Sequence, residues 1–174
     1  VWLLMLLLAP VASSAVPVRE VKDMAGRKVV LPAQVRRIVC IGGALRYVVY
    51  LQGLDRVVGV EALEQKKQWA SAARLYSLAV ADKVRGMPVI GEGGPGRLPD
   101  FERLIALSPD LVVAMGVSSG QAEIIQERSG IPVLLLQYGN SVGTLDLTLV
   151  REAMVLLGRV LGKEKRAESL VRFL

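Results

Sequence analysis

The 174-residue chain has no histidine and only one cysteine. These absences exclude a Ser-His or Cys-His nucleophile pair, a zinc site built from His and Cys ligands, and a disulfide within the chain. Cys40 lies in an apolar run, so we expect a small buried hydrophobic side chain and not a reactive thiol. We predict no catalytic residue, no metal site and no cofactor.

Aromatic residues are also few, at 5% of the chain, whereas Lys and Arg number 22 against 16 Asp and Glu, a net charge of +6. The basic residues are scattered, and there are too few aromatic rings for a platform on which bases stack. We therefore predict no nucleic-acid partner. A basic domain that binds a membrane surface or a nucleic acid through its net charge remains one alternative.

No apolar run reaches the roughly 18 residues that a membrane-spanning helix needs. The first fifteen residues carry no charge and end in Ser13, Ser14 and Ala15. An apolar core followed by small residues predicts a secretory signal peptide over 1–15, cleaved after about Ala15. The basic residues that usually begin such a peptide are missing, so an uncleaved anchor is the alternative.

The hydrophobic pattern predicts an α/β domain with a parallel sheet flanked by helices. A hairpin of strands over 16–21 and 27–31 comes first, with its turn over 23–26. We expect a loop with a short helical piece over 61–85. The remaining elements alternate: buried strands over 37–41, 57–60, 111–114 and 131–136, and helices over 44–52, 101–107, 121–129, 145–161 and 163–174.

The stretch 88–114 predicts a strand, loop, helix and strand in succession. Val89 and Ile90 form the first apolar run, and Asp100 has the position of a helix N-cap. Phe101, Leu104, Ile105 and Leu107 have helical spacing and should face the core. Such a unit implies a right-handed crossover, which places the loops after the strands at the one edge of the sheet where ligands bind.

The glycine-rich loop over 91–96 matches the pattern G-x-G-x-x-G of dinucleotide-binding domains. The expected helix begins several residues after Gly96, Pro95 removes a backbone donor, and no acidic residue ends the next strand. A nucleotide-binding α/β enzyme domain therefore remains an alternative only. The other interpretations are a loop that receives an anion or a ligand oxygen through its backbone, and a structural turn.

Six blocks in order resemble the periplasmic binding proteins of ABC importers for iron–siderophore complexes, haem and cobalamin. They are 21–32, 36–44, 51–60, 100–114 (D-F-E-R-L-I-A-L-S-P-D-L-V-V-A), 130–136 (G-I-P-V-L-L-L) and 161–168. The resemblance implies two α/β lobes joined by a long helix, with the ligand held between them. This chain resembles the N-terminal lobe over 16–161 and the truncated start of the connecting helix over 162–174.

The resemblance implies a binding protein and not an enzyme, located outside the cytoplasm. Its partners would be an iron–siderophore complex or other metal chelate and an ABC permease with its ATPase. In this family an acidic residue in the first turn of the helix matching 101–107 docks on the permease, a position that Glu102 occupies. Favourable interaction of Glu102 with the helix dipole is the structural alternative.

The loops that follow the strands supply the candidate ligand contacts. Where relatives often have a serine-rich turn after the first buried strand, this chain has Gly42, Gly43 and, further on, Arg46 and Tyr47. The basic and aromatic residues suggest an anionic or chelated ligand. The full set of predicted ligand-binding residues is Gly42, Gly43, Arg46, Tyr47, Arg74, Tyr76, Gly93, Gly94, Arg97, Ser118 and Tyr138.

Overall fold

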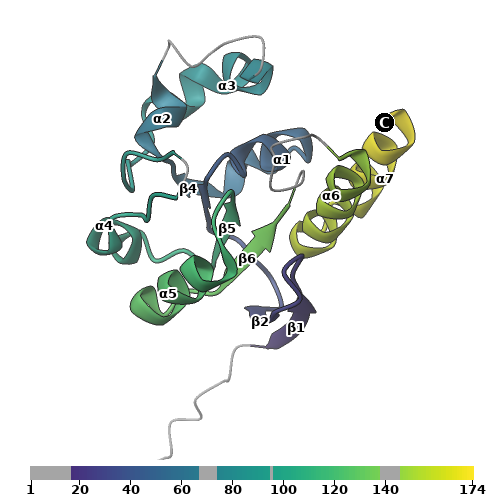
Figure 1. Ribbon diagram of the computed structural model, residues 1–174. Helices are drawn as coiled ribbons and strands as arrows, with labels where there is room; N and C mark the ends of the chain where they lie inside the picture. The colour runs from purple at the N-terminus through teal and green to yellow at the C-terminus, as the bar shows by residue number, and fades with distance from the viewer. Residues whose placement is uncertain (1–16, 67–73, 95, 138–145) are drawn as a thin grey trace, which may run out of the picture.

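The computed structural model describes residues 17–66, 74–94, 96–137 and 146–174 (Figure 1). The predicted signal peptide and Tyr138 lie outside these residues. The strands are β1 (Val18–Lys22), β2 (Lys28–Pro32), β3 (Ile38–Ile41), β4 (Val57–Gly59), β5 (Leu111–Met115) and β6 (Val133–Leu136). The helices are α1 (Leu45–Tyr50), the 3-10 turn η1 (Leu54–Arg56), α2 (Ala62–Gln65), α3 (Leu75–Arg85), α4 (Phe101–Ala106), α5 (Ser119–Ser129), α6 (Leu147–Leu161) and α7 (Glu164–Phe173).

The central sheet is parallel, with the strand order β4-β3-β5-β6. Every residue of β3, β5 and β6 is buried, because helices cover both faces of the sheet. Continuous apolar runs are what such doubly covered strands require. The predicted fold class, a parallel sheet flanked by helices, is therefore confirmed.

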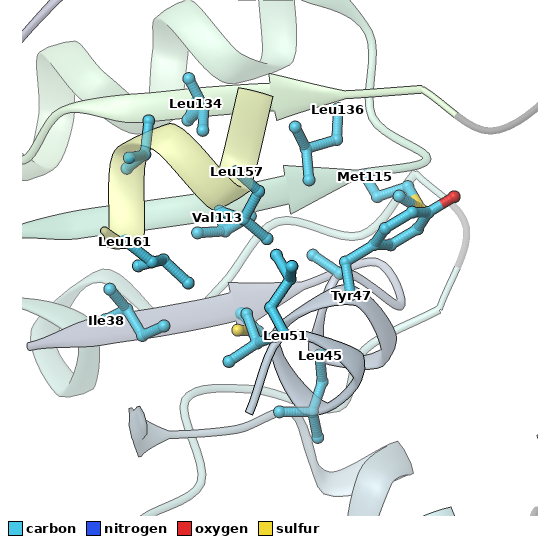
Figure 2. Close-up of a cluster of buried hydrophobic side chains, with 14 of the residues drawn as sticks. Ile38, Leu45, Tyr47, Leu51, Val113, Met115, Leu134, Leu136, Leu157 and Leu161 are labelled. Carbon is cyan, nitrogen blue, oxygen red and sulfur yellow. The ribbon is translucent and has the colours of Figure 1, made fainter. Parts of the chain in front are cut away.

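Two hydrophobic clusters lie on the two faces of the sheet. Alternate strand residues contribute to each, so that Val113 belongs to one cluster and Val112 to the other. Helices α1, α6 and α7 pack on the first face, and α4 and α5 on the second (Figure 1). Figure 2 shows the first cluster, where Leu157 and Leu161 of α6 face side chains from the strands and α1.

The hairpin of β1 and β2 is confirmed and is attached to β6 through its turn. Asp23 is buried and forms an ion pair with Arg27, 2.7 Å between Oδ2 and Nη2. The same Nη2 donates to the Val133 carbonyl oxygen at 2.7 Å, and the Met24 N–H donates to that of Leu135 at 3.1 Å. The buried ion pair thus holds the turn together, and the hydrogen bonds to Val133 and Leu135 fix the hairpin to the sheet.

Several helix ends have capping residues of the usual kinds, including the predicted cap Asp100. Asp100 accepts a hydrogen bond from the Arg103 N–H, and Ser118 forms a capping box with Gln121 at the start of α5. Gly130 and Gly162 end α5 and α6 with φ of 70° and 63°. Left-handed backbone of this kind favours glycine, which has no Cβ to clash.

Four details differ from the sequence prediction. Residues 75–85 form a full helix, α3, where a loop with a short helical piece was expected. Val89 forms only an isolated parallel bridge with Val60, so the first strand of the 88–114 unit is not a regular strand. Ile105 is exposed instead of facing the core. The helix expected over 44–52 ends at Tyr50, and Gln52 already has left-handed backbone, with φ of 56°.

Across the described ranges, no helix is both long and apolar enough to cross a membrane.

Candidate functional site

The carboxyl ends of the parallel strands meet at one edge of the sheet. We call this edge the rim and define it by the residues that follow the strands and the Val89 bridge: 42–44, 60–61, 91–94, 116–118 and 137. Strand β3 has β4 on one side and β5 on the other, so the chain changes direction of winding between β3 and β5. In open α/β sheets ligands bind at this switch point, outside the carboxyl ends.

Gly42 is the point of closest approach between the loops after β3 and β5. Its φ is 65°, and a Cβ at this position would overlap the carbonyl oxygen of Met115. Only glycine fits such a combination of backbone angle and contact. The Gly42 N–H turns toward β4 and donates to Oε2 of Glu61 at 2.9 Å.

Glu61 is a buried carboxyl at the end of β4 that connects the rim loops. It is 4% exposed, and burial raises its pKa from 4.5 to about 7, against the lowering effect of the Gly42 hydrogen bond. The charge of nearby Glu64 also raises this pKa, and Arg74 lowers it. A Cβ on Gly93 would lie 2.7 Å from the Cβ of Glu61, so glycine is needed there too.

A second group of charged and aromatic side chains lies next to Glu61. Arg74 pairs with Glu64, and the Tyr76 hydroxyl lies 3.0 and 2.9 Å from the two Glu64 oxygens. The guanidinium of Arg74 lies 5.5 Å from the centre of the Tyr76 ring, and that of Arg46 lies 5.6 Å from it. Tyr76 is therefore held by Glu64 and contacts two cations.

Arg46 differs from Arg74 in having no acidic partner. Within the described part of the chain its side chain forms no ion pair and no hydrogen bond, and its buried Nε has no partner. Its contact with the Tyr76 ring holds the guanidinium beside the rim while leaving its N–H donors unused. Because a guanidinium binds carboxylates and other oxyanions in bidentate fashion, Arg46 is the strongest candidate here for an anion contact.

The glycine loop and α5 form the other part of the rim. The Arg97 side chain is exposed, and the backbone N–H of Arg97 donates to the Gly94 carbonyl oxygen at 3.2 Å. Nε2 of Gln121 donates to the Gly96 carbonyl oxygen at 2.9 Å, which ties the loop to the start of α5 beside Ser118. No helix begins at Gly96, since residues 97–100 separate it from α4, so the loop lacks the geometry of a dinucleotide site.

The structure thus brings most of the predicted ligand-binding residues to the carboxyl edge of the sheet. Glu61 contacts Gly42 and Gly93. Glu64 contacts Arg74 and Tyr76, and Arg46 lies over the Tyr76 ring. Their contact with a ligand stays a prediction.

Two aromatic residues of the predicted set are buried. Tyr47 is 2% exposed and belongs to the first hydrophobic cluster, where its ring lies beside Met115 (Figure 2). Tyr76 is 3% exposed. The rings of both residues therefore pack against protein instead of lying open on the surface as pocket-edge residues would.

Sequence reasoning missed Glu61 and Glu64. The available signal was the position of Glu61 directly after an apolar strand, which places it at the ligand-binding edge of a parallel sheet. Glu64 follows at helical spacing in α2, and its burial depends on Arg74 and Tyr76, ten and twelve residues later.

The remaining residues singled out in the sequence are Glu102 and Cys40. Glu102 is exposed in the first turn of α4, whereas Leu104 of the same helix is buried. Cys40 is buried, and burial raises the pKa of its thiol, so it has the character of a core residue. The described residues contain no group of three His, Cys, Asp or Glu side chains placed to hold a metal ion.

A family comparison matches residues 41–174 to the family described as periplasmic binding protein. Because the match covers more than half of the chain, the protein belongs to this family. No curated protein matches the chain in a direct sequence comparison.

Solved structures of similar fold include periplasmic binding proteins. MolA of Haemophilus influenzae, bound to molybdate, is 23% identical with a TM-score of 0.70, over 88% of this chain and 49% of its own. A periplasmic solute-binding protein of Veillonella parvula is 24% identical with a TM-score of 0.69, over 90% and 45%. SirA of Staphylococcus aureus, complexed with staphyloferrin B, is 21% identical with a TM-score of 0.60, over 89% and 46%.

The chain therefore spans about half the length of these solved structures. At such identities the likeness shows the fold alone. The family match confirms the resemblance stated from the sequence, and the likeness in fold, over about half of each solved chain, fits one lobe of a two-lobed binding protein.

Proposed function

We propose that the chain is the N-terminal lobe of the solute-binding component of an ABC importer. It would capture an iron chelate of the siderophore type, or a related metal complex, and deliver it to the membrane permease. The observation that carries the choice of an anionic cargo is the Arg46 guanidinium, which has no acidic partner and no hydrogen bond among the described residues. It would work by binding and not by catalysis.

Two properties of the rim support an oxygen-rich, negatively charged ligand. Glycines 42, 43, 93 and 94 all have positive φ, and at glycine the backbone is open to close approach by ligand oxygens. Arg46 supplies a guanidinium whose charge is not neutralised by a carboxylate. The solved relatives include one bound to molybdate and one complexed with staphyloferrin B, so similar folds hold both an oxyanion and a siderophore.

The rest of the proposal concerns the whole importer. Residues 16–161 would form the lobe and 162–174 the start of the helix that leads to a second lobe, with the ligand enclosed when the two lobes close. Glu102, exposed on α4, would dock on the permease. The location would be extracytoplasmic, with residues 1–15 as the signal peptide.

Ligand titration tests the proposal. The protein together with its second lobe should bind one member of a panel of ferric catecholate, carboxylate and hydroxamate chelates, haem, cobalamin and molybdate with a Kd of about 1 μM or tighter. ATP and NAD serve as the comparison for the nucleotide-binding alternative. Binding of a nucleotide alone, or of no member of the panel, contradicts the proposal.

The Arg46→Ala variant tests the role of the guanidinium. Because a hydrogen bond to a charged group contributes about 1.5–3 kcal/mol, we expect the affinity for an anionic ligand to fall at least about tenfold. Arg103→Ala is the matched control, since Arg103 is an exposed arginine on α4 whose ion pair, among the residues that the structure describes, is with Asp100. Isothermal titration measures both variants. Equal ligand affinities of the Arg46→Ala and Arg103→Ala variants would show that Arg46 does not contact the ligand.

A further inference from the structure

A hollow lies at the edge of the sheet opposite the rim, where the strands begin. Its volume is about 550 Å³. Val35 and Arg36 precede β3, and Asp55 and Arg56 precede β4, so these lining residues mark the amino ends of the strands. The end of α6 and the start of α7 complete the wall. This hollow is distinct from the rim, which lies at the carboxyl ends.

Four arginines contributed by four different segments line this hollow, which we call the arginine pocket: Arg19 of β1, Arg36 of the β2–β3 connection, Arg56 of η1 and Arg159 of α6. Two acidic residues, Asp55 and Glu164, line it as well. Within the described residues none of the four arginines forms an ion pair, so the pocket wall carries an excess of positive charge.

Neutral acceptors hold three of the guanidinium groups in place. Nη1 and Nη2 of Arg19 donate to the carbonyl oxygens of Arg159 and Val160, at 3.2 and 2.5 Å. Nη1 of Arg56 donates to the Val35 carbonyl oxygen at 3.0 Å, and Nη2 of Arg36 to Oε1 of Gln34 at 2.7 Å. These acceptors belong to the same wall, so the cations are positioned without losing their charge.

Each of these three arginines also keeps donors that no described acceptor uses. A guanidinium has five N–H donors, whereas Arg36 and Arg56 each use one of theirs in a side-chain hydrogen bond and Arg19 uses two. Nε of Arg19 is buried and has no hydrogen-bond partner in the described part of the chain. A ligand that accepts several hydrogen bonds and carries negative charge matches this wall.

We propose that the arginine pocket binds a phosphate group. A tetrahedral oxyanion accepts paired N–H donors from several guanidiniums at once, which is the geometry for which arginine is best suited. The volume of the pocket exceeds that of a bare ion and accommodates a phosphate ester. The phosphate can come from a soluble molecule or from the headgroup of an anionic phospholipid, and the chemistry of recognition is the same.

Two binding measurements separate these sources. Isothermal titration with inorganic phosphate and with glycerol 3-phosphate reports a soluble ligand, for which we expect a Kd of about 1 mM or tighter. Co-sedimentation with vesicles of phosphatidylglycerol, compared with vesicles of phosphatidylcholine, reports a lipid headgroup. In either case binding should weaken as salt rises, because the contacts are ionic.

The double variant Arg36→Gln/Arg159→Gln tests the assignment, because both side chains are exposed and their loss should leave the fold intact. We expect at least a tenfold loss of the binding that the unmodified protein shows. Arg103→Gln on α4 is the matched control and should bind unchanged. Asp55→Asn removes an exposed negative charge from the wall and should tighten binding about twofold or more.

The proposal is overturned if neither the soluble phosphates nor the phosphatidylglycerol vesicles bind. It is also overturned if the double variant and the Arg103→Gln control bind equally well. Because ligand capture at the rim is measured separately, either result leaves the importer proposal untouched.

Discussion

Glu61 joins three loops of the rim through one buried carboxyl. It accepts the Gly42 N–H after β3, lies in the loop after β4, and lies against Gly93 of the glycine loop. The neighbouring backbone continues this linkage, since the Ala62 N–H donates to the Gly91 carbonyl oxygen at 2.8 Å. A change in the charge of Glu61 therefore acts on all three loops together.

This carboxyl makes stability depend on pH. The folded state binds the Glu61 proton more tightly than the unfolded chain does, because the pKa rises from 4.5 to about 7. The free energy of unfolding should therefore fall by roughly 2 kcal/mol as pH rises from about 4.5 to about 7. The charges that act on the group are Glu64 and Arg74, and the Gly42 N–H faces it.

Glu61→Gln keeps an acceptor for Gly42 and removes the titration. Urea unfolding of this variant across the same pH range should give a flatter profile than that of the unmodified protein. Glu102→Gln, at an exposed site, serves as control and should leave the slope as it is. Parallel profiles for the unmodified protein and Glu61→Gln would show that Glu61 is not the responsible group.

Helices α6 and α7 pack closely because of one glycine. A Cβ added to Gly158 of α6 would lie 2.7 Å from the Cβ of Ala167 in α7, closer than two such carbons approach. Ala167 is buried, and the Lys163 N–H donates to the Gly158 carbonyl oxygen at 2.7 Å, so neither partner moves away freely.

Gly158→Ala should therefore destabilise the protein, although alanine favours helices. Overpacking a core contact typically costs about 1–3 kcal/mol, which exceeds the gain in helix propensity of roughly 1 kcal/mol. Thermal unfolding measures the change. Adding Ala167→Gly removes the clashing carbon, and the double variant should recover part of the loss. A stabilised single variant would mean that α7 shifts without cost.

Local signals explain which elements the sequence predicts well. The apolar run of β5 and the Asp100 cap each depend on neighbouring residues, and both are confirmed. Helix α3 was missed because its apolar stripe is weak and Leu75 and Leu78 are exposed. Its position depends on contacts with α1 and α2 that the local pattern does not encode.

The same distinction applies to the candidate site. A parallel sheet fixes the edge at which glycine loops gather, so Gly42 and Gly93 could be predicted from their place after apolar runs. The charge partners could not, because the pairing of Arg74 with Glu64 and the isolation of Arg46 arise from packing across several elements. The sequence therefore predicted the edge of the sheet at which a ligand could bind. It did not predict which charged side chains at that edge have no partner within the protein.

At the scale of the whole molecule, Glu102 lies on the exposed surface of α4. This residue is exposed in the first turn of α4, and its only proposed role is contact with the permease. Removing it should leave ligand affinity unchanged, since it takes no part in the rim.

Glu102→Ala should weaken transport without weakening capture. The measurement is ligand-stimulated ATP hydrolysis by the reconstituted permease and ATPase, which we expect to require a several-fold higher concentration of the variant. Glu127→Ala, an exposed acid on α5, is the matched control. If both variants stimulate the ATPase equally, the docking surface lies elsewhere.

The attachment of the hairpin to β6 also protects the molecule from self-association. Strand β6 is the last strand of the sheet, and its residues are apolar throughout. Left bare, such an edge would offer its carbonyl and amide groups as a template for a strand of another copy. Arg27 and Met24 of the hairpin turn donate to the carbonyl oxygens of Val133 and Leu135, so these two acceptors of β6 are not free to pair with a strand of another copy. The hairpin that covers this edge precedes β6 in the chain by more than a hundred residues.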